Sequence, residues 1–262
     1  MKKICNQNLF SAQITGEGEP VLCLSGFGCD HYNFESLDFN AHMVKLDNRG
    51  MGKSENNLDS YPLELLAVDA HEFMVALGFN SYHVVGISMG GIIAQECALQ
   101  FPKNVKTLTL MCTTAGGKDF RSLPSLLEDD LRAFHSLPAE KAARIAVAAT
   151  SCHPEKFEEI IQLRLNHPAV LEEVLKQKRA VDIYLRQSKD LSQIKCPTLI
   201  MTGANDRYVD PKNSYILKNK IPHSWLVTID DADHLFFLEK PEEVSTHVVQ
   251  FLNGEVCYDL AQ

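Results

Sequence analysis

Three residues that are far apart in the sequence have the side chains needed for nucleophilic catalysis. Ser88 lies between Gly86 and Gly90, and Asp206 and His234 follow later in the chain. A serine hydroxyl is a weak nucleophile until an imidazole accepts its proton, and a carboxylate fixes the tautomer of that imidazole. We therefore expect Ser88 to act as the nucleophile, His234 as the base and Asp206 as the acid that orients the base.

The residues around Ser88 predict a strand, a sharp turn and a helix. Val84 and Val85 belong to an apolar run before the turn, and a helical pattern continues after it. A serine with a glycine two residues away on each side, between strand and helix, is the nucleophile-elbow pattern. By chance alone, roughly one chain in ten of this length contains it, so an ordinary glycine-rich turn is the alternative. The context on both sides favours the elbow.

Asp206 and His234 each follow a predicted strand. Residues 197–202 and 225–229 are apolar runs, and the two side chains lie in the loops after them. In a parallel sheet, the loops beyond the carboxyl ends of the strands converge on one site, so these residues are expected to meet Ser88. Four other carboxylates are alternatives for the acid, and each is otherwise explained as a helix cap or an exposed turn residue. They are Asp210, Asp230, Asp231 and Asp233.

Nine other histidines compete with His234 for the role of base. His31 is nearest to the predicted site, but its loop is expected to serve another part of that site, so its contribution is minor. The others lie in predicted helices or near strand starts, and none follows the carboxyl end of a strand: His42, His71, His83, His135, His153, His167, His223 and His247. The position of His234 therefore favours it.

The order of the predicted elements indicates an α/β fold. Residues 2–15 predict a hairpin, and buried strands and amphipathic helices alternate after it, which is typical of a parallel sheet with right-handed crossovers. Between residues 118 and 195 the strand-like runs are replaced by helical patterns. We therefore predict an α/β core formed by residues 1–117 and 196–262, with a helical cap, or lid, formed by residues 118–195.

The composition narrows the classes of function. The chain has 262 residues, 45% of them hydrophobic, and a net charge of -9, which argues against a nucleic-acid or anionic-membrane surface. The N-terminus lacks the apolar segment of a signal peptide, and no run is long enough to span a membrane. Eight cysteines are scattered without CxxC spacing, at positions 5, 23, 29, 97, 112, 152, 196 and 257. Cys23, Cys97 and Cys112 lie inside apolar runs, which predicts small buried thiols in a reducing compartment, so we expect a soluble, cytoplasmic protein.

Two other motifs are weaker. Residues 50–54 resemble the end of a phosphate-binding loop, but Asp47 occupies the position that requires glycine. Cys29, Asp30 and His31 are potential metal ligands, but the sequence shows no spaced partner cluster, so no metal is expected. The stretch from Asp47 to Ser54 is better explained as a structural turn that supports the site.

Taken together, these motifs resemble the α/β-hydrolase superfamily over nearly the whole chain. The matching segments are residues 25–28, 47–54, 86–90, 203–206 and 233–234. The resemblance implies an eight-stranded, mostly parallel sheet flanked by helices, with a helical cap inserted after the sixth strand. It also implies hydrolysis through an acyl-enzyme intermediate. The chain looks most similar to small bacterial serine esterases, a group that includes pimeloyl-carrier methyl esterases and enol-lactonases.

The same resemblance implies an oxyanion hole made of backbone N–H groups. The donors would be Met89, just after the nucleophile, and Phe27, whose ring would also form a wall of the acyl pocket. Ser25 stands where the family usually has histidine. Serine can still hydrogen-bond this loop, so the role of the loop is expected to persist.

The leading hypothesis is a cofactor-free serine hydrolase that cleaves a small to medium carboxylic ester. Lactonase, acyl thioesterase and carbon–carbon bond hydrolase activities use the same machinery, and a ligand receptor with slow turnover is a further alternative. The partner is a small-molecule ester, and the sequence does not fix the oligomeric state. An acidic acyl-carrier protein is an alternative partner if the basic residues of the cap share one rim: Arg121, Arg132, Lys141, Arg144, Arg164, Lys176, Lys178, Arg179 and Arg186.

Overall fold

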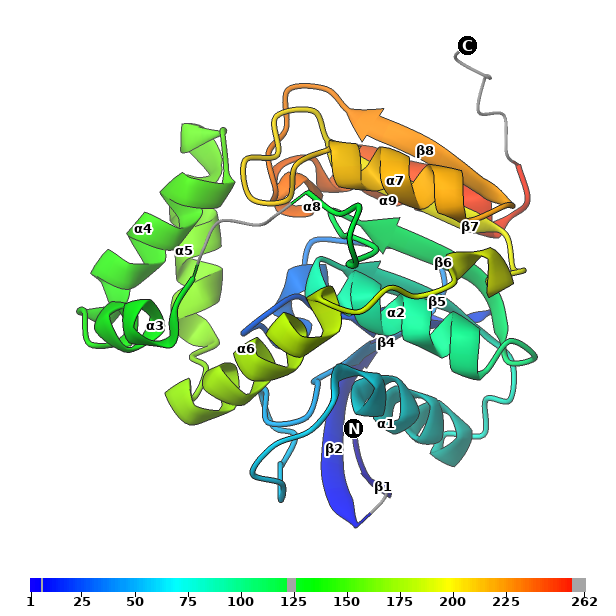
Figure 1. Cartoon of the computed structure of the whole chain (residues 1–262), viewed down its shortest axis with the longest axis horizontal. Helices are drawn as coiled ribbons and strands as arrows, with labels where there is room; N and C mark the ends of the chain where they lie inside the picture. Colours follow the sequence, from blue (N-terminus) through cyan, green and yellow to red (C-terminus); the bar gives the residue numbers. More distant parts are fainter. Residues whose placement is uncertain (6, 122–125, 256–262) are drawn as a thin grey trace.

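One sheet organises the molecule in the computed structural model, which describes residues 1–5, 7–121 and 126–255. Its eight strands have the order β1-β2-β4-β3-β5-β6-β7-β8 (Figure 1). They are β1 (Lys2–Cys5), β2 (Asn8–Thr15), β3 (Pro20–Leu24), β4 (His42–Leu46), β5 (Tyr82–Ile87), β6 (Val105–Met111), β7 (Thr198–Gly203) and β8 (Ser224–Ile229). Strand β2 is antiparallel to both neighbours, and the pairs from β4 to β8 are parallel. The predicted eight-stranded, mostly parallel sheet is confirmed.

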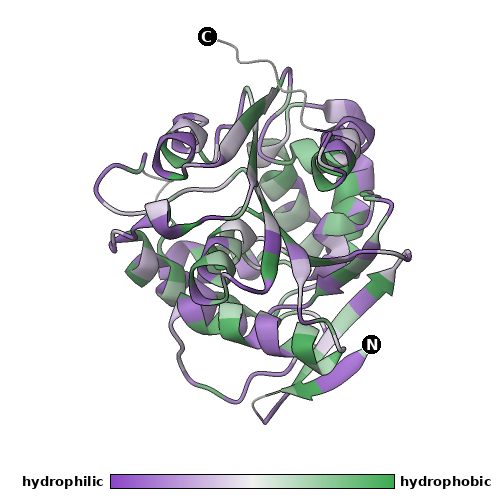
Figure 2. Ribbon diagram, turned by 90° about the vertical axis from the view of Figure 1, so that its right-hand side faces the viewer, coloured by the Kyte–Doolittle hydropathy of each residue, from purple (hydrophilic) through white to green (hydrophobic). Residues whose placement is uncertain are grey.

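Helices cover both faces of the sheet. Side chains alternate between the faces along each strand, so Leu22 packs on one side and Val21 on the other. The helices on the first side are α1 (Leu63–Ala76), α2 (Met89–Gln100) and α7 (Lys212–Lys220), and those on the second are α8 (Phe236–Glu239) and α9 (Pro241–Leu252). Figure 2 shows hydrophobic residues on the strands between these layers. Both faces are apolar because both are buried.

A group of helices lies between β6 and β7 in the chain, and we call residues 128–185 the helical insert. It consists of α3 (Glu128–His135), α4 (Ala139–Thr150), α5 (Phe157–Asn166) and α6 (Leu171–Leu185), with the short turn η2 (Pro154–Lys156). In Figure 1, α3, α4 and α5 stand to the left of the sheet, and α6 returns toward α2. The helical texture of this region is therefore as predicted, while its division from the core as a separate cap domain stays a prediction.

The order of the strands brings several loops to one edge. The parallel strands are consecutive neighbours in the order β4, β3, β5, β6, β7 and β8, so the loops after their carboxyl ends lie side by side. The loop after β3 contains the turn η1 (His31–Phe34), and η3 (Leu191–Gln193) precedes β7. Each described cysteine is a free thiol, and Cys257 lies outside the described residues.

Candidate active site

Ser88 occupies a strained turn between β5 and α2. Its backbone has φ 54° and ψ −117°, a conformation that residues other than glycine rarely adopt. The neighbouring glycines permit the tight approach: a Cβ atom at Gly86 would lie 2.2 Å from the Gly90 carbonyl oxygen, and one at Gly90 would lie 2.0 Å from the Leu24 carbonyl oxygen. The turn therefore requires glycine at both positions.

Asp206 and His234 are in direct contact. Nδ1 of His234 lies 2.9 Å from Oδ2 of Asp206, and both side chains are buried. The other oxygen, Oδ1, accepts the backbone N–H groups of Tyr208 at 2.9 Å and Val209 at 2.7 Å. These bonds fix the carboxylate, which holds Nδ1 as the protonated nitrogen and leaves Nε2 as a proton acceptor.

The alternative acids have other partners. Asp233 accepts the backbone N–H of His234 at 2.8 Å and pairs with the guanidinium of Arg207, with Nε 2.6 Å from Oδ2. Asp210 accepts the backbone N–H of Lys212 at 2.9 Å. Within the described part of the chain, Asp206 is the carboxylate that contacts the imidazole ring of His234.

Cys112, at the end of β6, lies beside this pair. One ligating atom from each of Cys112, Asp206 and His234 lies within 4.8 Å of the others. Burial lowers the pKa of His234, whereas the charge of Asp206 and its hydrogen bond raise it, and the net result is a pKa well above the ordinary value. Burial also raises the pKa of Cys112, so its thiol is neutral at neutral pH. The sequence predicted a buried cysteine here but not its contact with the imidazole.

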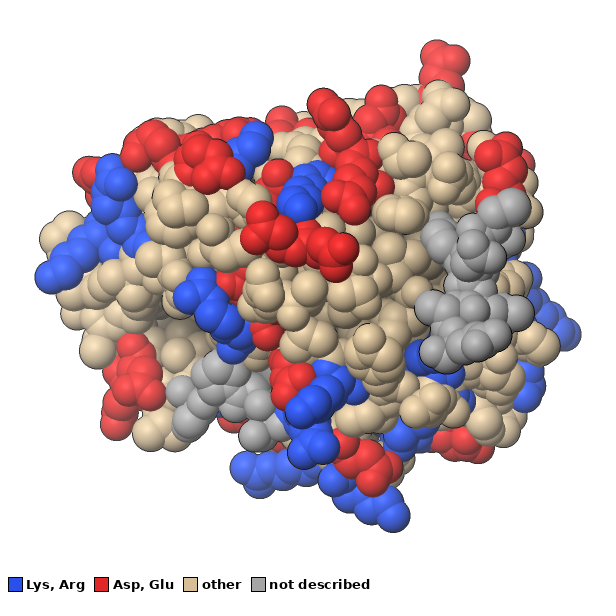
Figure 3. Space-filling model, turned by 90° about the horizontal axis from the view of Figure 1, so that it is seen from above, with Lys and Arg blue, Asp and Glu red and all other residues tan. Residues whose placement is uncertain are grey.

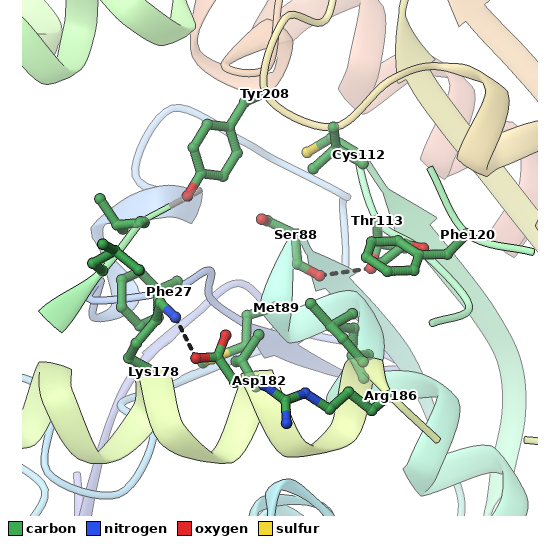
Figure 4. A pocket seen from close by; sticks show the side chains of 17 residues that line it. Phe27, Ser88, Met89, Cys112, Thr113, Phe120, Lys178, Asp182, Arg186 and Tyr208 are labelled. Carbon is green, nitrogen blue, oxygen red and sulfur yellow. Dashed lines mark hydrogen bonds and ion pairs between the residues drawn. The ribbon is translucent and has the colours of Figure 1, made fainter. Parts of the chain in front are cut away.

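Two cavities meet at Ser88. The smaller has a volume of about 370 Å³. Figure 4 shows Ser88 at the start of α2, with Lys178 and Asp182 on α6 and Arg186 just after that helix. The larger has a volume of about 580 Å³ and is lined by Ser88, His234 and residues of α3, α4 and α5. The residues shared by both cavities are Phe27, Ser88, Leu126 and Tyr208.

Ser88 and His234 therefore face one space, although the described residues include no hydrogen-bond partner for the Ser88 hydroxyl. Such bonds often form only when substrate is bound. Tyr208, which the sequence analysis missed, packs its ring 5.1 Å from that of His234, measured between centroids. It follows Asp206 by two residues, and only the fold shows that it points into the site.

The loop after β3 lies against Ser88. A Cβ atom at Gly26 would be 3.4 Å from Cβ of Ser88. Among the described residues, no acceptor is recorded for the backbone N–H of Phe27 or of Met89, so both remain available as donors. Phe27 lines both cavities, and its role as a wall of the acyl pocket stays a prediction.

Side chains from distant segments hold this loop. The Gly26 N–H donates to Oδ1 of Asn33 at 3.0 Å, and the Gly28 N–H donates to Oε1 of Gln177, on α6, at 2.9 Å. The expectation that the Ser25 hydroxyl hydrogen-bonds the loop is wrong, because this buried group has no partner among the described residues. The amide of Asn48 instead donates to the Ser25 carbonyl oxygen at 3.2 Å. Neither Asn33 nor Gln177 was identified from the sequence.

His31 lines neither cavity. Its Nδ1 lies 2.7 Å from Oδ1 of Asp47, while Nδ1 of His167, from the insert, lies 3.0 Å from Oδ2 of Asp30. Asp30, His31 and His167 thus form the cluster that the sequence could not show, because His167 is far away along the chain. These histidine–carboxylate pairs tie the loop after β3 to the core and to the insert.

Residues 19–241 match the sequence model of the α/β-hydrolase fold family. The chain belongs to this family. It is 27% identical over 254 residues to Lipase 3 of Moraxella sp. (strain TA144), a match that covers 90% of this chain and 78% of that protein. The predicted family is therefore confirmed.

Solved structures agree. A thermophilic esterase from Thermogutta terrifontis superimposes with a TM-score of 0.77 at 27% identity, covering 97% of this chain and 98% of that one. The enol-lactonase from Burkholderia xenovorans LB400 shares the fold, with a TM-score of 0.79 at 20% identity and coverage of 97% and 100%. Membership of this hydrolase family, together with the esterases and lipases among the relatives, supports the conclusion that the chain is an enzyme. In the described part of the chain, no helix combines the length and apolar character needed to cross a membrane.

Proposed function

We propose that this α/β hydrolase is a serine esterase that cleaves a small to medium carboxylic ester through an acyl-enzyme intermediate. The observation that carries the proposal is the 2.9 Å contact between Asp206 and His234, whose ring lines the same cavity as Ser88. The strained turn at Ser88 and the esterase and lipase names among the relatives support it.

In the first half of the reaction, Oγ of Ser88 attacks the carbonyl carbon of the ester while Nε2 of His234 accepts the hydroxyl proton. The negative charge that develops on the carbonyl oxygen is stabilised by the N–H groups of Phe27 and Met89. The tetrahedral intermediate then collapses, the bond to the alcohol oxygen breaks, and the alcohol leaves with the proton from His234. Asp206 stabilises the imidazolium between these events.

In the second half, water attacks the acyl-enzyme. Nε2 of His234 accepts a proton from the water, and the new tetrahedral intermediate uses the same N–H donors. Its collapse releases the carboxylic acid and returns the proton to Oγ of Ser88. No group other than Ser88, His234, Asp206 and the backbone donors is required for this sequence of steps.

The two cavities on either side of Ser88 would hold the two parts of the ester. Their volumes, about 370 Å³ and about 580 Å³, fit groups of modest size. In this proposal the helical insert serves as the cap that selects the substrate, because α3, α4 and α5 line the larger cavity and α6 lines the smaller one.

Turnover of p-nitrophenyl esters of increasing acyl length, beside lactones and acyl thioesters, tests this function. We expect esters to give the highest kcat/KM, and Ser88→Ala to lower kcat by at least about 10³-fold. Ser136→Ala, at the exposed end of α3, is the control and should leave the rate unchanged. Full activity in Ser88→Ala, or a preference for lactones or thioesters, would contradict the proposal.

A further inference from the structure

An arginine in the larger cavity has no acidic partner. Arg164 lies in the last turn of α5, is partly buried, and lines the cavity that also contains Ser88 and His234. Its Nη1 donates to the hydroxyl of Tyr32 at 3.3 Å. Within the described ranges, no carboxylate forms an ion pair with its guanidinium.

This sets Arg164 apart from most basic residues of the insert. The pairs that those residues form with carboxylates of the insert are Arg132–Glu172, Arg144–Glu140, Arg144–Glu158, Lys156–Glu159, Lys176–Glu173, Lys178–Asp182 and Arg179–Glu128. On the face shown in Figure 3, basic and acidic side chains are likewise interspersed. The charge of Arg164 instead faces a cavity.

The neighbours of Arg164 do not neutralise it. Burial raises the pKa of Tyr32, so its phenol is neutral at neutral pH. The carboxylate of Asp30 is engaged by His167. Asp130 lines the same cavity but is exposed, and it accepts the backbone N–H of Leu127 at 2.9 Å at the start of α3. A guanidinium that is partly withdrawn from water without a counter-charge is costly, and a bound anion offsets that cost.

The geometry points to a carboxylate-binding subsite at Arg164, beside the Tyr32 hydroxyl, which also contacts the Cys29 thiol at 2.9 Å. This inference rests on the proposed esterase function and adds to it a substrate class: esters that carry a free carboxylate on the part that occupies the larger cavity. A planar guanidinium suits a carboxylate, since it donates two parallel hydrogen bonds. The apolar side chains around it, such as Leu131 and Ile160, would pack on the carbon chain between the ester and the carboxylate.

The competing explanation is structural, because Arg164 also joins α5 to Tyr32 and lies at the C-terminal end of a helix, where a cation is favourable. The experiment therefore compares matched esters. In one pair, p-nitrophenyl esters of equal acyl length end in a methyl group or a carboxylate. In the other pair, acetates of phenol and of a hydroxybenzoate place the carboxylate on the alcohol. The ratio of kcat/KM within each pair is measured for the native chain, Arg164→Gln and Arg164→Lys.

In the native chain, we expect kcat/KM to be higher for the carboxylate ester than for the neutral ester in one of the two pairs. That pair identifies whether the acyl or the alcohol part occupies the larger cavity. Arg164→Gln should reduce that ratio about 10- to 100-fold, the value of a charged hydrogen bond, because the carboxylate ester loses more kcat/KM than the neutral ester does. Arg164→Lys should retain part of the preference. Arg144→Gln, which removes an exposed paired arginine, is the matched control and should retain all of it.

An equal loss on charged and neutral esters, or unchanged ratios in both pairs, would overturn the proposal while leaving the esterase function intact. If no ester is hydrolysed, the esterase function fails, and the carboxylate subsite is then tested separately by ligand binding to the Ser88→Ala variant. Calorimetric titration with amide analogues of the same compounds should show tighter binding of the carboxylate form, and Arg164→Gln should abolish that difference. Equal affinities would again overturn the subsite.

Discussion

The edge of the sheet and the helical insert hold their polar side chains in different ways. At the edge, Asp206 is buried and accepts hydrogen bonds from Tyr208, Val209 and His234, so its carboxylate has one position. On the insert, ion pairs such as Arg179–Glu128 are exposed and contribute little to stability. The difference indicates that the proposed chemistry depends on the edge, whereas the surface of the insert can vary freely.

Two residues of the insert point inward and, unlike its exposed ion pairs, contact the loop after β3 or line a cavity. Gln177 is fully buried and holds the N–H of Gly28, and Arg164 faces the larger cavity. The insert thus supplies both the lining of the cavity and a support for the loop that contains Phe27. Variants of the two regions should separate these contributions.

The largest expected effect lies at the edge of the sheet. Asp206→Asn should lower kcat by about 10²- to 10⁴-fold, because an amide no longer selects the reactive tautomer of His234. Asp210→Asn is the matched control and should stay within about twofold of the native rate. Steady-state turnover of a p-nitrophenyl ester measures both. A loss of only a few-fold in Asp206→Asn would mean that another residue is the acid.

The pH dependence also tests the edge. His234 must be neutral to accept a proton, and its pKa lies above the ordinary 6.5, so the neutral fraction and kcat/KM rise together as pH increases through that value. One pH unit below the midpoint, kcat/KM should be about tenfold below its plateau. The profile of kcat/KM on a neutral ester reports this midpoint. A midpoint at or below 6.5 would mean that burial outweighs the Asp206 carboxylate in setting the pKa of His234.

Gln177→Leu tests whether the insert supports the chemistry. Loss of the bond to the Gly28 N–H should disturb the adjacent Phe27 N–H, which is needed only as charge develops, so kcat should fall about tenfold with little change in KM. The control is Gln162→Leu, which removes an exposed amide on α5 that contacts Glu158. If KM rises instead and kcat is unchanged, the glutamine acts on substrate binding.

The smallest effect is expected on the outer face of the insert. Arg179→Gln removes the exposed pair with Glu128 and should leave kcat/KM within about twofold and the melting temperature nearly unchanged. Thermal unfolding and ester turnover check this directly. A large loss of activity here would show that the surface of the insert is as constrained as the edge of the sheet.

The sequence predicted the parts of the site that are encoded locally. The apolar runs marked the strands, and the strand-to-helix glycine pattern marked the turn at Ser88, where a Cβ at Gly86 or Gly90 would collide with the backbone. Because parallel strands end at the same edge, Asp206 and His234 could be expected there as well. In the structure, Nδ1 of His234 lies 2.9 Å from Oδ2 of Asp206, and their catalytic roles stay a prediction.

The remaining features depend on segments that are distant along the chain. The spacing of apolar residues shows which face of α6 is buried, but it does not show that the Gln177 side chain accepts the N–H of Gly28. The residues next to Cys112 in the sequence do not indicate that His234 is its neighbour in space. Likewise, the sequence alone groups Arg164 with the other basic residues of the cap. Its orientation toward the cavity follows from how α5 packs, which charge counting cannot show.

The central claim is that Ser88 forms a covalent bond with the substrate's acyl group. Labelling of the native chain with a fluorophosphonate probe, followed by peptide mapping, tests it most directly. We predict one probe per chain on the peptide that contains Ser88, no labelling of Ser88→Ala, and native labelling of Ser136→Ala. Modification at another residue, or none in a folded protein, would contradict the account.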